Sequence, residues 1–418
     1  MKTNNIPEIR FSGFTGDWEQ RELSDLATFI KGSGYSKQDL KESGSPIILY
    51  GRLYTNYKTL IEDVDTFVKE KENSVISLGG EVIVPSSGES AEDISRASVV
   101  GKPGIILGGD LNIIRPNKQI DPIFLALAIS NGSPNRDMAK RAQGKSVVHL
   151  HNSDLKKINL IFPQIEEQRK LVGLNLEIND LITLHQQELT TLKQIKQGFL
   201  QKMFPGEGET TPEFRFAGFT GDWEQRKLGN TKTIFTDGNY GEAYPSDIDM
   251  SDSLHGVPFL RGSDLKNGYL DVSKSNYITK EKHKELTSGH LEIDDIVIAV
   301  RGSLGALGYT GADNIGWNIN SQLAIIRTEK EELFGRFLIQ YFLSNKGQKE
   351  LLSRNTGTAL KQLPIKQLKD VPVPITSMNE QIQIGNFFKQ CDEIIALHER
   401  ELDALNETKK AFLQKMFV

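Results

Sequence analysis

The stretch PEIRFSGFTGDWEQREL occupies residues 7–23 and returns as PEFRFAGFTGDWEQRKL at residues 212–228, with 14 of 17 positions identical. A second pair closes each copy: LHQQELTTLKQIKQGFLQKMF at residues 184–204 returns as LHERELDALNETKKAFLQKMF at residues 397–417. The segments between these repeats are long and barely resemble each other. The chain therefore consists of two similar frames with different inserts, which predicts two domains built on one plan.

Length and composition are those of a globular protein with two or three domains. Half of the 418 residues is enough for a repeat unit to bury a core of its own. No apolar run approaches the ~20 residues that cross a bilayer, and the N-terminus lacks an apolar signal region. Cys391 is the only cysteine, so the sequence has neither a disulfide framework nor a CxxC metal pair. We expect a reducing cytoplasm.

The net charge of −5 argues against binding of nucleic acid over the whole surface, but a clustered basic strip is enough for a local site. Residues 135–157 form such a strip, with only Asp137 and Asp154 as acidic residues. Its basic residues are Arg136, Lys140, Arg141, Lys145, Lys156 and Lys157. A solvated helix-and-loop surface is the simpler interpretation of an isolated charge run.

The second repeat predicts two long helices. Apolar residues step by four and three in both copies, and this 3.5-residue stripe is typical of helices packed lengthwise. A helix over residues 165–203 would be ~58 Å long, and its best partner is the other copy. The residues expected in this seam are Ile182, His185, Leu189, Leu192, Phe199, Ile395, His398, Leu402, Leu405 and Phe412. The two histidines favour seam packing over metal ligation, because neither has a second ligand at helical spacing.

The inserts, residues 24–151 and 229–364, contain short β-branched runs between Gly, Pro, Asn and Asp residues, a pattern that predicts strands. They include SPIILYG, GEVIVPSSG and GIILGGDLNIIRP in the first insert, and GVPFLRGSD, DDIVIAVRGS and INSQLAIIRTE in the second. Each insert also carries one predicted helix, at residues 122–131 and 332–352. The fold class is α+β: two α/β domains separated by two long antiparallel helices, with a pseudo-two-fold repeat.

This organisation gives five segments. They are an N-terminal arm and first domain (1–151), the first long helix region (152–204), a linker (205–214), the second domain (215–364) and the second long helix region (365–418).

The motif QGKSVV at residues 143–148 contains the Gly-Lys-Ser of phosphate-binding loops. Such a loop needs a glycine five positions before Gly144, where Ala139 stands, and it follows a strand, whereas this motif follows a basic, helical segment. A flexible basic loop is the better interpretation. The second insert has TGTALKQLP at the corresponding place, with Gly357 matching Gly144.

No enzyme signature of the HExxH, GxSxG or GxGxxG type occurs in a suitable context. Trp18 and Trp223 in the GDWEQR repeats are predicted to anchor the start of each domain. We therefore predict no catalytic residues and no metal site in this chain.

Several polar and aromatic positions suit contacts with phosphates or base edges. YGRLYTNYK at residues 50–58 alternates tyrosines with cations, although half-buried strands do so as well. The turns PSSGES and VRGS end corresponding apolar strands. The candidate DNA-binding residues are Tyr50, Arg52, Tyr54, Tyr57, Lys58, Ser86, Ser87, Arg141, Lys145, Ser146 and His149 in the first half, and Arg261, Lys266, Arg301, Ser303, Thr358, Lys361 and Gln362 in the second.

Taken together, the repeated GDWEQR arm, the strand end LGGDLNIIRP, EEQRKL at the start of a long helix and the closing FLQKMF resemble the DNA specificity subunit of type I restriction-modification enzymes. The similarity extends over nearly the full chain. It implies two target-recognition domains, each reading one part of a split DNA site, and a subunit without catalysis of its own. Recognition domains diverge with their targets, so the resemblance assigns no base-reading residues.

The resemblance also implies partners. Modification subunits, two of them, methylate adenine with S-adenosylmethionine, and restriction subunits translocate and cut with ATP and Mg; double-stranded DNA is the common ligand. Two other functions stay open at the level of sequence: a stand-alone enzyme acting on nucleic acid, and an adaptor whose coiled coil tethers other proteins. Near-identical frames around unlike inserts favour the recognition function.

Overall fold

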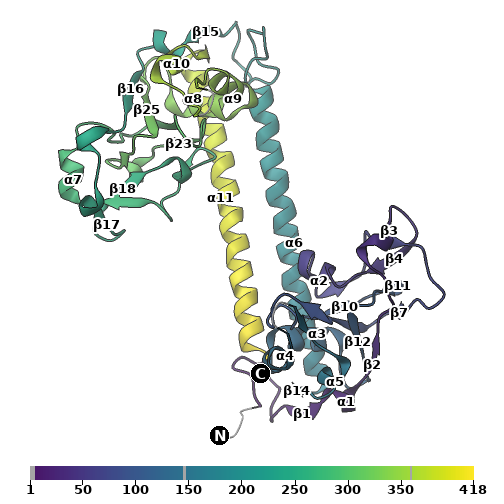
Figure 1. Cartoon of the computed structure of the whole chain (residues 1–418). Coiled ribbons are helices and arrows are strands. Elements are labelled where there is room, and N and C mark those ends of the chain that lie inside the picture. The colour runs from purple at the N-terminus through teal and green to yellow at the C-terminus, as the bar shows by residue number, and fades with distance from the viewer. Residues whose placement is uncertain (1–4, 145–146, 358–359) are drawn as a thin grey trace. The chain divides into compact units, whose positions relative to one another are not determined.

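The chain forms two compact units in a computed structural model that describes residues 5–144, 147–357 and 360–418 (Figure 1). The first unit runs to Gln186 and takes in Glu401–Val418, and the second unit is Gln187–Arg400. Each contains one mixed α/β domain and a stretch of both long helices, α6 (Ile165–Lys202) and α11 (Met378–Lys415).

The domain of the first unit is built on two five-stranded sheets, ordered β2-β12-β8-β10-β5 and β3-β6-β4-β11-β7. The apolar runs form their central strands, and β8 is buried along its whole length. The strands are β1 (Glu19–Glu22), β2 (Ala27–Lys31), β3 (Leu40–Lys41), β4 (Ser45–Ile48), β5 (Leu60–Ile61), β6 (Phe67–Val68), β7 (Ile76–Leu78), β8 (Glu81–Pro85), β9 (Ser87–Gly88), β10 (Ser98–Val100), β11 (Pro103–Leu107), β12 (Leu111–Pro116), β13 (Val148–His149) and β14 (Asn159–Phe162). The helices are α1 (Leu23–Leu26), α2 (Arg52–Thr55), α3 (Pro122–Asn131), α4 (Ser133–Arg141) and α5 (Asn152–Leu155), with a 3-10 turn at Lys37–Asp39.

The domain of the second unit has two four-stranded sheets, ordered β16-β25-β22-β23 and β17-β21-β18-β24. Its strands are β15 (Glu224–Lys227), β16 (Ile234–Asp237), β17 (Met250–Ser251), β18 (Val257–Leu260), β19 (Leu265–Lys266), β20 (Tyr269–Leu270), β21 (Asn276–Ile278), β22 (Ile296–Ala299), β23 (Leu307–Tyr309), β24 (Asn318–Ile319), β25 (Leu323–Arg327) and β26 (Pro372–Ile375). The helices are α7 (Lys280–Glu285), α8 (Gly335–Leu343), α9 (Asn345–Leu352) and α10 (Ile365–Lys369). Short 3-10 turns lie at Leu228–Asn230, Gly241–Ala243, Asp247–Asp249, Gly262–Asp264 and Ala312–Asn314.

The strands and long helices predicted from the sequence are confirmed, and α3 spans the predicted residues. The prediction of one helix over residues 332–352 is wrong, because α8 ends at Leu343 and α9 starts at Asn345. Ser344 causes the break: its Oγ accepts a hydrogen bond from the Gly347 amide at 3.1 Å and so acts as the N-cap of α9. Residues 50–58 contain the short helix α2 and no strand.

An aromatic anchor fixes the start of each domain, as the GDWEQR repeats predict. Trp18 is buried against Phe124 at 6.1 Å between ring centroids, and Phe124 also contacts Phe417 at 5.6 Å. In the second unit Trp223 contacts Phe204 at 6.2 Å. Both tryptophans therefore sit in the cores on which the ends of the long helices pack.

Each arm is also joined to the start of a long helix by a buried ion pair. In the first unit Arg10 donates two hydrogen bonds to Glu167, from Nε at 2.7 Å and from Nη2 at 2.8 Å. In the second unit Arg215 binds Glu380 in the same way, at 2.6 and 2.8 Å. Glu167 and Glu380 are 1% and 0% exposed and lie near helix N-termini, where a negative charge is favoured. The same fork–fork contact thus occurs once in each unit.

The glutamine that follows each buried glutamate forms hydrogen bonds with carbonyl groups of its domain. Gln168 donates to the carbonyl oxygens of Gln119 at 3.0 Å and Pro163 at 2.8 Å. Gln381 donates to those of Glu332 at 3.2 Å and Thr376 at 2.8 Å. Both side chains are fully buried and satisfied. The Glu-Gln dipeptide therefore fixes the arm, the domain and the long helix to one another within each unit.

The long helices run antiparallel within each unit. In the second unit Phe199 contacts Phe387 at 5.0 Å and Lys193 pairs with Glu399 at 2.7 Å, so rising numbers on α6 meet falling numbers on α11. In the first unit, residues of both helices, including Ile178 and Phe412, line one narrow gap. Of the expected seam residues Ile182 is buried, and His185, Leu189, Leu192, Phe199, Ile395, His398, Leu402, Leu405 and Phe412 are half-buried. His185 lies 3.9 Å from Glu401 in the first unit, as His398 does from Glu188 in the second.

A prediction follows for the buried ion pair. Replacing Glu380 with alanine should lower the free energy of unfolding by about 3 kcal/mol, because it leaves the Arg215 guanidinium without its partner in a largely buried place. Urea denaturation of the full chain followed by circular dichroism measures this. Lys227→Ala is the control, since it removes a surface pair with Asp370 and should cost at most about 1 kcal/mol. Equal effects of the two substitutions would contradict a special role for the Arg-Glu contact.

Candidate nucleic-acid interface

A small hairpin in the first unit begins at Gln143 and ends at His149. The amide of Gln143 donates to the carbonyl of His149 at 3.1 Å, and the amide of His149 donates back at 2.8 Å. Gly144 has φ +137, and a Cβ atom there would lie 1.9 Å from the carbonyl oxygen of Val147. The turn therefore requires glycine. Lys145 and Ser146, both predicted to bind DNA, lie outside the described residues.

One strand of this hairpin, β13, pairs with β9, which follows the central strand β8 in the sequence. His149 in β13 lies opposite Ser87 in β9, directly after β8, and the amide of Leu150 donates to the carbonyl of Ser86 at 3.1 Å. The polar turn after β8 and the hairpin are thus brought together, although 62 residues of sequence separate Ser87 from His149.

The second unit repeats this arrangement with other side chains. Thr356 and Gln362 exchange backbone hydrogen bonds of 2.8 and 2.9 Å, and Gly357 has φ +89. Gln362 bridges to Arg301 after β22, and the amide of Leu363 donates to the carbonyl of Val300 at 2.9 Å. Arg301 therefore occupies the place of Ser87, and Gln362 the place of His149. Thr358 is outside the described residues, and Lys361 is exposed.

We name these four residues the paired positions: Ser87 with His149, and Arg301 with Gln362. The side chains bond to each other in both units. Ser87 Oγ and His149 Nδ1 share a hydrogen bond of 3.2 Å, and Arg301 Nε donates to Gln362 Oε1 at 3.1 Å. The same frame thus holds two chemically different polar pairs at the surface.

One aromatic residue, Tyr54, contacts the first pair. The hydroxyl of Tyr54 donates to the carbonyl of Ser87 at 2.9 Å, and burial raises the pKa of Tyr54 to about 12, so the phenol stays protonated at neutral pH. Tyr50 packs edge-on against Tyr54 at 6.3 Å. The hydroxyl of Tyr57 donates to the carbonyl of Ala97 at 3.1 Å, and its ring is partly exposed. Lys58 is exposed next to these rings in the sequence.

Some predicted residues serve the fold of the domain. Arg52 is 11% exposed and pairs with Asp65 at 2.7 Å, and Ser86 is buried. Arg141 donates to the carbonyl of Lys157 at 3.3 Å. Arg261 donates to the carbonyl of Lys274 at 2.5 Å, which fixes a loop of the second domain.

Lys266 and Ser303 come together at one depression of the second unit. Both line a groove of about 820 Å³ that also includes Asn267 and Gly302. Lys266 pairs with Asp271, so its charge is partly compensated. Ser303 is exposed in this groove.

Three further residues near the paired positions were not predicted as site residues. The Arg96 guanidinium lies 5.4 Å from the Tyr54 ring and 5.8 Å from the Tyr57 ring. Tyr240 lies under Arg301, with 5.4 Å between guanidinium carbon and ring centroid. His151 stacks with His149 at 6.5 Å. Of these, only His151 could have been found from the sequence, because it lies two residues after His149. Arg96 and Tyr240 are brought near the paired positions by the tertiary structure.

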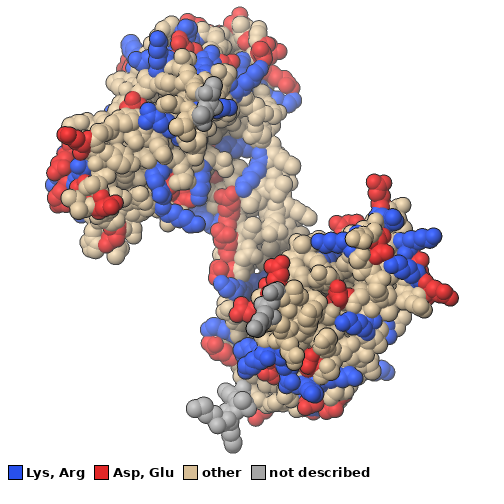
Figure 2. All heavy atoms as spheres, in the orientation of Figure 1, with Lys and Arg blue, Asp and Glu red and all other residues tan. Residues whose placement is uncertain are grey.

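Basic side chains are exposed on α4 and just after α5 in the first unit, and Figure 2 shows Lys and Arg interspersed with Asp and Glu over this unit. Arg136, Lys140, Lys156 and Lys157 are all exposed there. The strip adjoins the hairpin in sequence on both sides, and its charge density suits phosphate contacts.

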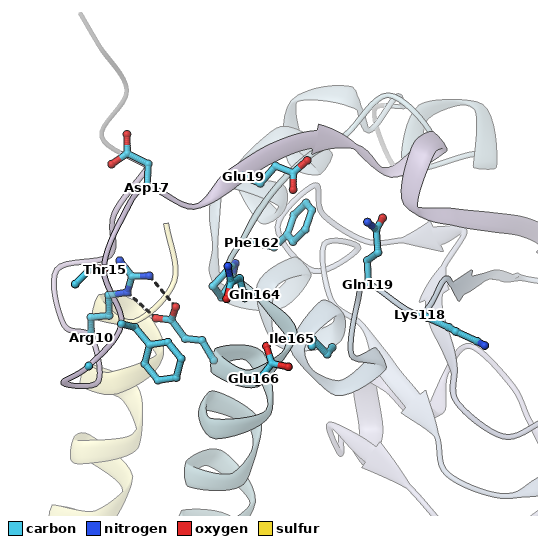
Figure 3. A pocket seen from close by; sticks show the side chains of 14 residues that line it. Arg10, Thr15, Asp17, Glu19, Lys118, Gln119, Phe162, Gln164, Ile165 and Glu166 are labelled. Atoms are coloured by element: carbon cyan, nitrogen blue, oxygen red, sulfur yellow. Dashed lines mark hydrogen bonds and ion pairs between the residues drawn. The ribbon is translucent and has the colours of Figure 1, made fainter.

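A separate polar cavity of about 710 Å³ lies at the N-terminus of α6 (Figure 3). Arg10, Glu19, Lys118, Gln119 and Glu166 are among its lining residues. The Arg10 guanidinium, which lines the cavity, is bound by Glu167, so the cavity belongs to the joint between arm and helix.

Comparison with known proteins identifies the class. A family model described as the type I restriction modification DNA specificity domain matches residues 15–194 and 221–407. The chain belongs to this family, whose members are DNA-recognition subunits without a catalytic centre. This confirms the expected family and the expected non-enzymatic role.

Individual relatives agree. A Methanocaldococcus jannaschii protein named as the specificity subunit of the type I restriction enzyme MjaX is 25% identical over 99% of this chain and 95% of its own length. The Escherichia coli EcoBI specificity subunit is 25% identical over 65% of this chain and 60% of its own length. The crystal structure of an S subunit of a type I restriction-modification system from M. genitalium has a similar fold, with a TM-score of 0.60, 14% identity and 99% of both chains covered. In the described ranges no helix is long and apolar enough to cross a membrane.

The hairpin gives a testable expectation. Gly144→Ala should weaken binding to specific DNA about tenfold, because the added methyl group forces the turn to open. Gly198→Ala in α6 is the matched control, since a Cβ there meets nothing within 4 Å. Fluorescence anisotropy with labelled duplex and a thermal melt of both variants measure the effect. Unchanged affinity of the folded Gly144→Ala variant would exclude the hairpin from the interface.

Proposed function

We propose that this chain recognises a bipartite DNA site, in which each domain reads one of two unlike half-sequences on either side of an unread spacer. The observation that carries this proposal is the pair of equivalent hairpins: the backbone frame is the same in both units, whereas the exposed side chains on it differ. Two domains with the same backbone frame but different exposed side chains suit the recognition of two different half-sites.

The basic surface supports a division between positioning and reading. Arg136, Lys140, Lys156 and Lys157 suit phosphate contacts, which set register and carry no sequence information. The paired positions and the groove at Ser303 supply the hydrogen-bonding groups that select bases. Lys361 and, from the sequence, Lys145 belong to the phosphate set in this proposal.

The antiparallel helices suit a spacer. A heptad of helix measures ~10.5 Å, which corresponds to about three base pairs of duplex. The length of α6 and α11 would then fix the separation of the two half-sites.

The partners are modification subunits that methylate adenine and restriction subunits that cut DNA. Four exposed apolar side chains support a docking role for the helices: Leu181 and Leu184 on α6, and Ile394 and Leu397 on α11, between 41% and 50% exposed. They lie at equivalent repeat positions, one pair in each unit, which suits two modification subunits. S-adenosylmethionine, ATP and Mg would be bound by these partners in the cytoplasm, and not by this chain.

The spacer proposal predicts the effect of shortening both helices. Removal of one heptad from α6 and the facing heptad from α11 should reduce the preferred spacer by about three base pairs and leave both half-sequences unchanged. Mapping of methylated adenines in DNA treated with the assembled complex measures both features. An unchanged spacer in an active complex would exclude the helices as the ruler.

The docking proposal predicts the effect of a charge on the apolar surface. Leu184→Glu together with Leu397→Glu should weaken assembly with modification subunits at least tenfold, because a carboxylate resists burial at an interface. Size-exclusion chromatography with light scattering measures assembly. Leu254→Glu is the control, because Leu254 is also exposed but lies in a loop of the second domain. Normal assembly of the double variant would contradict the docking surface.

Two other functions have distinct outcomes. A stand-alone enzyme would turn over ATP or S-adenosylmethionine without partners, and we expect no turnover. A structural adaptor would bind DNA without sequence preference in a footprinting assay, and we expect a preference.

A further inference from the structure

The backbone at the paired positions is held by main-chain hydrogen bonds. In both units the hairpin pairs through main-chain hydrogen bonds: His149 with Gln143 and Gln362 with Thr356. The next amide, of Leu150 or Leu363, then bonds to the end of the central strand. Because these bonds involve no side chain, the frame can keep its shape while the paired residues change.

Arg301 is oriented from three sides. Its Nε donates to Gln362 Oε1 at 3.1 Å, and its Nη1 makes a longer contact of 3.4 Å with the carbonyl of Ser321. The Tyr240 ring lies against the guanidinium, and the Tyr240 hydroxyl donates to the carbonyl of Ser321 at 3.0 Å. These contacts hold the planar group in one orientation while Arg301 stays exposed.

Two other arginines of this domain, Arg226 and Arg327, are bound to carboxylates. Arg226 pairs with Glu332 at 2.6 Å, and Arg327 pairs with Asp295 at 2.8 Å. Among the residues that the structure describes, no carboxylate forms an ion pair with Arg301. The nearby Asp237 is half-buried, and burial raises its pKa while the charge of Arg301 acts in the opposite direction. The positive charge of Arg301 is therefore not neutralised by an ion pair with a described residue.

A fixed and exposed guanidinium has a specific ligand among base edges. Two parallel N–H groups match the O6 and N7 acceptors of guanine in the major groove, and no other base pair offers that pattern to arginine. A phosphate would also accept two hydrogen bonds. Recognition of a phosphate, however, needs neither a buttressing glutamine nor a ring that restricts the plane of the group.

The first unit offers different chemistry at the same place. Ser87 and His149 are joined by a hydrogen bond, and His151 stacks on His149. A hydroxyl and an imidazole both donate and accept, and neither presents two parallel donors. This pair therefore suits a base other than the one that arginine selects.

We propose that the paired positions select one base in each half-site, with Arg301 reading a guanine and Gln362 positioning it, and with Ser87 and His149 reading a different base in the other half. This inference rests on the proposed bipartite recognition and extends it to particular residues.

The test is selection of bound duplexes from a random-sequence library by the complex of the full chain with its modification subunits. The wild-type complex should select two half-sequences, one of which contains an essential guanine. With Arg301→Lys the preference for that guanine should fall about tenfold to hundredfold, because lysine keeps the charge but lacks the planar fork. Affinity for non-specific DNA and its salt dependence should change little, because lysine keeps the positive charge.

Two more variants separate reading from folding. Gln362→Ala should reduce discrimination at the same guanine to a smaller extent, because Arg301 loses its orienting acceptor. His149→Ala should change one position in the opposite half and leave the guanine intact. Thermal melts of all three variants should remain close to that of the wild type, since these residues lie at the surface or only half-buried.

The outcomes are distinguishable. A wild-type complex that selects no motif removes the proposed function and this inference with it. A defined wild-type motif with the guanine still required in Arg301→Lys overturns the inference alone. The same holds if affinity falls equally for all sequences, or if Arg301→Lys and His149→Ala alter the same half-site.

Discussion

The structure of each unit depends on a Glu-Gln dipeptide in the first turn of a long helix. Glu167 and Glu380 bind the arginine of an arm, and Gln168 and Gln381 bind carbonyl groups of the domain. Burial of these four side chains is tolerated because every one of them has a partner. Arm, domain and helix therefore meet at one point in each unit, and a domain attached there has a defined orientation on its helix.

This joint explains which parts of the chain repeat. The arm, the tryptophan anchor and the helix ends must keep complementary shapes, and these are the segments with near-identical sequence. The side chains at the paired positions need no such complementary shape. The position of each hairpin is set by backbone hydrogen bonds and by a glycine with positive φ. A frame of this kind can accept new surface residues without loss of its fold, which suits a family of DNA specificity subunits.

The sequence predicts those features that depend on local patterns. The 3.5-residue stripe gave both long helices, and turn-bounded β-branched runs gave the strands. The prediction of helix boundaries from the sequence failed where a single side chain sets the boundary, as Ser344 does between α8 and α9. The sequence also could not separate surface cations from structural ones: Arg52 and Arg301 are both candidate DNA-binding residues, yet Arg52 binds Asp65 within the fold. Tyr240 and Arg96 were missed because only the tertiary structure brings them to the paired positions.

The central claim is that specificity lies in the segments that do not repeat. The most direct measurement is the methylation pattern of a complex in which residues 229–364 are replaced with residues 24–151, so that both frames carry the first insert. The account predicts a symmetric site whose two halves both match the half-sequence read by the first unit, with the spacer unchanged. A folded, active complex that still methylates the original asymmetric site would contradict it.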